Sequence, residues 1–248
     1  MMMKQFILTI VTLLCLLNGI VSDTPDNSAP KHYRITHEAV FNIVIKENAE
    51  TDEILSEGKV IIGLFGEIVP MTVLNFVTIT NGVVRSNINF TYNDVPIHRV
   101  VRDFCIQTGD FLNRDGTGSE YSYQEKKKIE NFDLGTSIYG TKFVDENFRL
   151  SHRSAGWVSM ANHGKDTNGS QWFVTLVPSR WLDGHHVVFG RVLQGIDFIH
   201  EIGEIETYPG TSIPKKYVGI VHGSATEVEK RYDLTLEDLS SNEDIIVA

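Results

Sequence analysis

The chain has 248 residues, of which 32 are acidic and 22 are basic, so its formal net charge is −10. This balance argues against a nucleic-acid partner, because phosphate binding requires a basic face. Hydrophobic residues make up 42% of the chain, which is typical of a protein with a substantial apolar core.

The first 22 residues have the pattern of a secretory signal peptide. Lys4 precedes an apolar run over 6–17, and polar residues follow from Asp23. The run is shorter than the ~20 apolar residues that span a bilayer, so we expect cleavage near Ser22. An uncleaved signal anchor is the alternative. The pattern predicts a location in the secretory pathway: the endoplasmic reticulum lumen, another endomembrane lumen or the extracellular space.

Short apolar segments separated by Gly, Asn and Asp turns follow a polar linker over 23–37 and predict β-strands. Pro70 opens a predicted helix over 70–80, and a second helix is predicted from Gly195, where apolar residues are spaced for one buried face. This pattern predicts a mainly β fold, a closed antiparallel barrel with helices over its open ends. The predicted strands cover 40–45, 59–65, 96–101, 104–108, 156–160, 171–176, 187–193 and 217–222.

The last part of the chain, residues 225–248, is rich in acidic residues. We predict an acidic C-terminal tail there. One amphipathic helix and disorder are the two alternatives for its structure.

Five segments resemble the cyclophilins, in the order in which that family carries them. They are GKVIIGLFGEIVPMTVLNF (58–76), IHRVVRDFCIQTGDF (97–111), SIYGTKFVDENF (137–148), SMANHGKDTNGSQWF (159–173) and WLDGHHVVFG (181–190). The resemblance implies a cyclophilin-type domain over 38–224, an eight-stranded antiparallel barrel capped by two α-helices. It also implies peptidyl-prolyl cis–trans isomerase activity without a cofactor or metal.

The resemblance also assigns site residues, position by position. The residues implied to be catalytic are Arg99, Phe104, Gln107 and His186. The residues implied to bind substrate are Cys105, Thr117, Ala161, Asn162, Gln171, Phe173, Trp181 and Leu182. Proline-containing peptides and unfolded client proteins are the implied partners, Trp181 implies binding of cyclosporin, and we expect a monomer.

These residue types suit the isomerisation of a peptide bond that precedes proline. Rotation about an amide is opposed by ~18–20 kcal/mol of resonance energy, and no bond has to break. A catalyst must therefore bind the twisted amide better than either planar form. Arg99 offers a permanently charged donor to the proline nitrogen, while Phe104, Phe173 and Leu182 can form an apolar cup for the proline ring.

Three departures from the family pattern bear on the site. Arg102-Asp103 stands where the family commonly has Pro-Gly, and Cys105 replaces a methionine. Since Cys15 lies in the predicted signal, Cys105 is the only thiol expected in the mature chain. The third departure is an insertion over 119–135, interpreted either as a tolerated surface loop or as a partner-binding or gating element.

Other polar residues suggest further chemistry. His185 and His186 are adjacent, but side chains of neighbouring residues diverge on a strand, so we do not expect a metal site. Two N-glycosylation sequons begin at Asn89 and Asn168. Asn89 is the expected acceptor because it falls in a predicted exposed loop, whereas Asn168 lies inside the site motif.

Three functions remain open on the sequence alone. The first is a working prolyl isomerase that assists protein folding in the secretory pathway. The second is a catalytically weak module that binds proline peptides, in which the changes at 102–105 or the insertion have reduced turnover. The third is a partner-binding chaperone that uses the insertion and the acidic tail.

Overall fold

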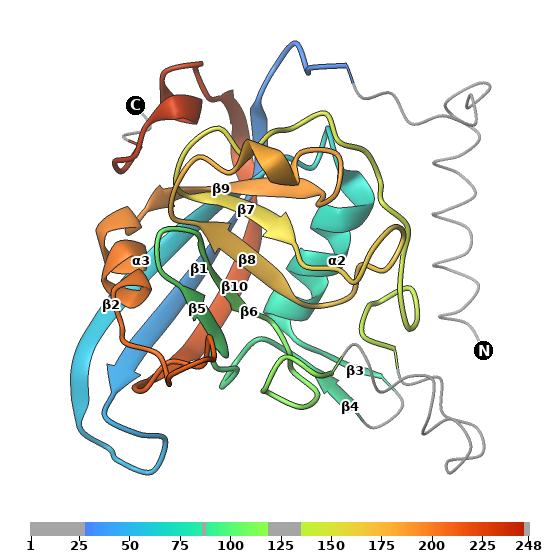
Figure 1. Ribbon diagram of the computed structural model, residues 1–248. Helices are drawn as coiled ribbons and strands as arrows, with labels where there is room; N and C mark the ends of the chain where they lie inside the picture. The colour runs from blue at the N-terminus through green and yellow to red at the C-terminus, as the bar shows by residue number, and fades with distance from the viewer. Residues whose placement is uncertain (1–27, 86–87, 119–134, 246–248) are drawn as a thin grey trace.

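The computed structural model describes residues 28–85, 88–118 and 135–245 (Figure 1). The predicted signal peptide, the first part of the predicted linker and nearly all of the predicted insertion lie outside these residues. In the described part of the chain, no helix has the length and apolar character needed to cross a membrane.

Eight strands form one antiparallel sheet in the order β10-β1-β2-β9-β7-β8-β6-β5. Every predicted strand corresponds to one of these eight, and the predicted mainly β fold is confirmed. The strands are β1 (Arg34–Lys46), β2 (Ile54–Leu64), β5 (Arg99–Val101), β6 (Cys105–Thr108), β7 (Trp157–Met160), β8 (Trp172–Thr175), β9 (Val188–Gln194) and β10 (Tyr217–Asp233).

Backbone hydrogen bonds join the two ends of this strand order. The segment that leads into β5 donates from Asp94 N to Ile220 O (2.7 Å) and from Ile97 N to Val218 O (2.9 Å). Ile220 N donates back to Val95 O (3.0 Å). Residues next to β5 therefore lie beside β10.

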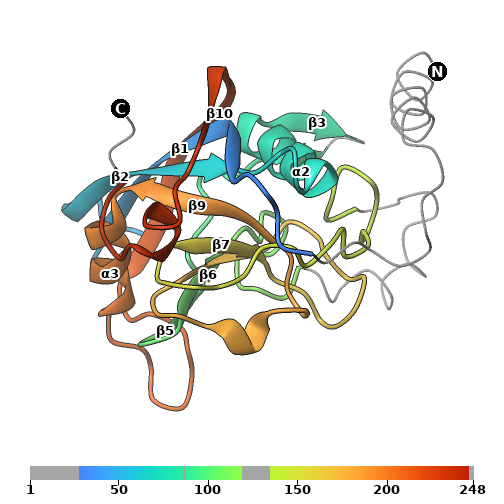
Figure 2. The ribbon, with the colours of Figure 1, turned by 90° about the horizontal axis from the view of Figure 1, so that it is seen from above.

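The two predicted helices are present as α2 (Pro70–Asn81) and α3 (Ile196–Gly203), and they lie at opposite ends of the domain, with strands of the sheet between them (Figures 1 and 2). Val69 provides no side-chain cap for α2. Glu146 from a distant loop takes that role, accepting hydrogen bonds from Met71 N (2.9 Å) and Thr72 N (2.8 Å). A carboxylate suits this place because the first amides of a helix have no partner within the helix.

A second, two-stranded sheet was not predicted. It consists of β3 (Val83–Arg85) and β4 (Ile88–Phe90). The expected loop around Asn89 is therefore a strand, although the Asn89 side chain is exposed as expected.

The C-terminal region differs from the predicted tail. Residues 225–233 continue β10 and pair with β1, whose first residue, Arg34, falls within the predicted linker. Leu234, Leu239 and Ile245 are buried, and a 3-10 helix covers Asp238–Ser240. The acidic composition was misleading because acidic side chains face solvent while these apolar residues anchor the segment.

The anchored segment closes over polar groups of the sheet. Leu239 O accepts a hydrogen bond from the indole of Trp157 (3.3 Å), and Ser241 O accepts one from the buried guanidinium of Arg191 (2.6 Å). Asp244 Oδ1 accepts from Ile196 N (2.9 Å), at the start of α3. The segment 234–245 is thus part of the folded domain.

We predict that Leu239→Ala lowers the free energy of unfolding by about 2–4 kcal/mol, because it removes a fully buried side chain and leaves a cavity. For a domain of this size the melting temperature should fall by roughly 4–16 °C, measured by circular dichroism. Leu236→Ala is the control, since Leu236 is 66% exposed in the same segment. Equal melting temperatures for Leu239→Ala and the unmodified protein would contradict the packing of this segment.

Candidate active site

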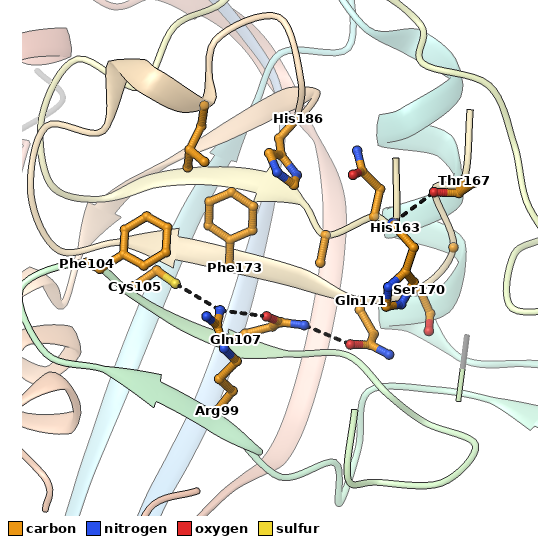
Figure 3. Close-up of a pocket in the computed structure, with 14 residues that line it drawn as sticks. Arg99, Phe104, Cys105, Gln107, His163, Thr167, Ser170, Gln171, Phe173 and His186 are labelled. Atoms are coloured by element: carbon orange, nitrogen blue, oxygen red, sulfur yellow. Dashed lines mark hydrogen bonds between the residues drawn. The ribbon is translucent and has the colours of Figure 1, made fainter. Parts of the chain in front are cut away.

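Three neighbouring strands place three predicted site residues in one row. Arg99 on β5 is opposite Gln107 on β6, and Gln107 is opposite Phe173 on β8. Residues opposite one another on antiparallel strands share a face of the sheet, so their side chains can meet. In Figure 3 these side chains border one pocket of about 390 Å³.

A hydrogen-bond relay holds the guanidinium of Arg99. Arg99 Nη1 donates to Gln107 Oε1 (3.2 Å), and Gln107 Nε2 donates to Gln171 Oε1 (2.9 Å; Figure 3). Gln171 Nε2 in turn donates to the backbone oxygen of Gly116 (2.9 Å). Each glutamine accepts at one end of its amide and donates at the other, so the relay fixes both amides and the guanidinium they face.

An apolar cup lies next to the relay. Its walls include Phe104, Phe173, Leu182 and His186. The ring of His186 stands perpendicular to that of Phe173, with ring centroids 5.4 Å apart. His186 Nδ1 lies 3.0 Å from Met160 O and must donate, because a carbonyl has no proton. Burial lowers the pKa of His186, which favours a neutral imidazole at the rim.

The turn before β6 sets the position of Phe104. Asp103 has a φ of 56°, the left-handed conformation that aspartate tolerates better than most residues. Phe104 N donates to Val101 O (3.0 Å), which closes the turn. Arg102 forms an ion pair with Glu204 beyond the end of α3. The Arg102-Asp103 pair therefore makes a tight turn that brings Phe104 to the pocket.

Cys105 lies beneath the guanidinium, with Sγ 3.7 Å from Arg99 Nη1, and only 1% of the residue is exposed. Burial raises the pKa of its thiol to about 11, although the nearby Arg99 acts in the opposite direction. The thiol is consequently protonated and unreactive at neutral pH.

Ten of the twelve predicted site residues line the pocket; the other two do not. Thr117 donates to Asp115 Oδ1 (2.6 Å) and accepts from Asn113 Nδ2 (2.9 Å), within the loop that carries Gly116. Trp181 is 62% exposed, and its ring lies 5.8 Å from that of Phe104, at the edge of the cup.

The structure adds pocket residues that sequence reasoning missed, namely His163, Thr167, Gly169 and Ser170. All four lie between Asn162 and Gln171, inside a motif that already supplied site residues. Their loop folds back so that His163 N donates to Thr167 Oγ1 (2.9 Å; Figure 3). The signal that could have found them is this position between two lining residues.

The predicted geometry of His185 and His186 was wrong. Both residues lie in the turn between the 3-10 helix Arg180–Leu182 and β9, and neither is on a strand. Within the described residues, no three His, Cys, Asp or Glu side chains are grouped so as to hold a metal ion.

The antiparallel sheet thus carries a pocket in which apolar side chains lie beside a hydrogen-bonded arginine. The family model described as cyclophilin type peptidyl-prolyl cis-trans isomerase/CLD matches residues 48–224. The chain therefore belongs to the cyclophilin family, and its enzymatic class is that of the peptidyl-prolyl cis–trans isomerases.

Two curated relatives support this membership over most of their length. Peptidyl-prolyl cis-trans isomerase D of Saccharomyces cerevisiae is 38% identical over 226 residues, which cover 91% of this chain and 88% of the relative. Peptidyl-prolyl cis-trans isomerase CYP21-1 of Arabidopsis thaliana is 41% identical over 177 residues, covering 70% of this chain and 71% of the relative.

We predict that Cys105 reacts slowly with iodoacetamide in the folded protein, measured by mass spectrometry in a Cys15→Ser chain. Because its thiol has a pKa of about 11, the rate should keep rising about tenfold per pH unit up to pH ~10. The guanidinium-unfolded chain is the control and should level off above pH ~9, near the ordinary thiol pKa. A similar plateau in the folded protein would contradict the burial of this thiol.

Proposed function

We propose that the pocket binds the residue before proline together with the proline ring, and that Arg99 stabilises the amide while it is twisted. The observation that carries this proposal is the guanidinium of Arg99, which is tethered through Gln107 beside the apolar cup. A tethered donor needs no reorganisation when the proline nitrogen becomes an acceptor, and this is the condition under which a fixed charge lowers a barrier most.

The cup complements this role. Phe104, Phe173 and Leu182 offer apolar surface to the proline ring, so the ring can stay seated while the preceding carbonyl rotates. Asn162 and Gln171 border the same pocket and can hold the peptide backbone. Bound in this way, the substrate reaches the twisted state without a nucleophile or a proton transfer.

The catalytically weak alternative depends on the changes at 102–105. The turn through Asp103 brings Phe104 to the pocket, and Cys105 lies against Arg99 as a protonated thiol. Both features favour a working isomerase over a module that only binds.

A chaperone role for the insertion at 119–135 is a separate hypothesis. If it holds, deleting residues 119–134 should abolish partner capture and leave isomerisation unchanged.

We further propose that the protein assists folding in the secretory pathway, with proline-containing unfolded chains as its clients. The N-terminal pattern Lys4, apolar run and polar flank supports this location. The exposed ring of Trp181 at the edge of the cup supports binding of cyclosporin, and we expect a monomer.

We also infer that the sheet closes into an eight-stranded barrel. The support is the set of backbone hydrogen bonds between residues 94–97 and β10, which link the two ends of the strand order. Closure would leave no free sheet edge beside β5, the strand that carries Arg99.

We predict that Arg99→Ala lowers kcat/KM about 100-fold on a proline peptide, since one preorganised charged donor contributes roughly 3 kcal/mol in the transition state. Peptide binding, measured by titration, should change much less. Arg99→Lys should fall in between because an ammonium lacks the rigid fork of donors. Arg231→Ala on β10 is the control, and unchanged catalysis by Arg99→Ala would refute the role given to the guanidinium.

We predict a single N-glycan, on Asn89, when the chain is expressed in a eukaryotic secretory pathway. Asn89 is exposed, whereas Asn168 is fully buried and donates through Nδ2 to Asp145 Oδ1 (2.8 Å). Asn89→Gln should remove the mass that an endoglycosidase releases, and Ser170→Ala, which deletes the second sequon, should leave that mass unchanged. A glycan that persists in Asn89→Gln would contradict the assignment.

A further inference from the structure

A buried histidine supports the apolar cup from within the protein. The ring of His152 is nearly parallel to that of Phe173, with an interplanar angle of 6° and ring centroids 5.9 Å apart. His152 is fully buried and does not line the pocket, whereas Phe173 does. Phe173 thus contacts two histidine rings, that of the buried His152 and that of His186 at the pocket. Figure 3 shows Phe173 and His186.

His152 is also bonded to the turn that forms a wall of the cup. Asp183 Oδ1 lies 2.9 Å from both the backbone N and the ring Nδ1 of His152, and His152 O accepts from Ser179 N (3.0 Å). Asp183 directly follows the 3-10 helix Arg180–Leu182, whose last residue lines the pocket. One residue therefore connects two sides of the cup, Phe173 and Leu182.

The charge on Asp183 makes this connection firm. Burial opposes ionisation of its carboxyl, but hydrogen bonds from His152 and Arg180 outweigh burial and hold the pKa of Asp183 below its usual range. An ionised Asp183 can only accept, so the hydrogen bond between the two side chains runs from Nδ1–H of His152 to Oδ1 of Asp183.

Packing alone does not account for a histidine at this place. Nε2 of His152 is buried and has no hydrogen-bond partner among the described residues. An unsatisfied buried nitrogen destabilises the fold, and a phenylalanine ring could stack on Phe173 without that cost. What histidine adds over phenylalanine is the bond from Nδ1 to Asp183.

We propose that His152 is a positioning residue of the cup, which holds Phe173 and the turn of Leu182 in register through its bond to Asp183. This inference rests on the proposed function only in taking the cup as the seat of the proline ring. The ring is seated in the planar and the twisted states alike, so a looser cup weakens both to the same degree. Such a change raises KM and leaves kcat unchanged.

The test measures KM and kcat for isomerisation of a proline peptide, together with the peptide Kd by titration. In His152→Phe the stacked ring remains and the Asp183 bond is lost, so we expect KM and Kd to rise about fivefold to tenfold. This rise is less than the full value of one charge-assisted hydrogen bond, because the bond acts on the peptide only through the cup. Asp183→Ala should have the same effect. Asp183→Asn keeps an acceptor for Nδ1–H and loses only the charge, so both values should stay within about twofold of those of the unmodified protein.

A stability control separates positioning from general damage. Leu239→Ala also removes a buried contact, but on the C-terminal segment, and should lower the melting temperature without changing Kd. If His152→Phe does not fold, the peptide Kd values of Asp183→Ala and Asp183→Asn test the positioning role instead. Both variants should fold, because the Asp183 side chain is partly exposed.

The outcomes for the cup and for the proposed function are distinguishable. Unchanged Kd in both His152→Phe and Asp183→Ala, or a Kd equally raised in Asp183→Asn, would overturn the positioning role even if the protein is an efficient isomerase. A raised Kd in His152→Phe and Asp183→Ala, with a near-normal Kd in Asp183→Asn, would support the positioning role. If Arg99→Ala then left catalysis unaffected, only the proposed role of the guanidinium would be refuted.

Discussion

The relay from Arg99 through Gln107 and Gln171 to the backbone oxygen of Gly116 is the constraint on which the active site depends. A free arginine side chain samples many rotamers, and ordering it on substrate binding would cost free energy in every catalytic cycle. Here that ordering is achieved when the protein folds. The relay also spans β5, β6 and the residue before β8, so the pairing of these strands and the orientation of the guanidinium depend on each other.

The remainder of the fold keeps this row of strands in place. In the middle of the sheet, Arg191 of β9 is fully buried beside Trp157 of β7, the strand next to β8, with its guanidinium 5.9 Å from the indole ring. Burial lowers the pKa of Arg191 to about 10, so it stays charged at neutral pH and needs the carbonyls that surround it. One of them, Ser241 O, belongs to the C-terminal segment. The acidic end of the chain thus supplies one of the acceptors of a buried cation.

The sequence predicted those features that depend on local pattern. Short apolar segments between turn residues located the strands, Pro70 located α2, and the motifs around Arg99 and Gln171 located the pocket. Features that depend on tertiary contacts were missed. The strand over 225–233 exists because β1 pairs with it, and nothing in its acidic composition announces that partner. Likewise, Thr117 bonds within its own loop and so lies outside the pocket lining, a detail that a family motif does not encode.

The most direct test of this account is a double-mutant cycle on catalysis between Arg99 and Gln107. If Gln107 acts by orienting the guanidinium, Gln107→Ala should reduce kcat/KM when arginine is present at position 99 and have little further effect in the Arg99→Ala background. The coupling energy should then approach the full effect of Gln107→Ala. Additive losses from the two substitutions would show that each side chain acts on the substrate independently, and would contradict a tethered guanidinium as the source of catalysis.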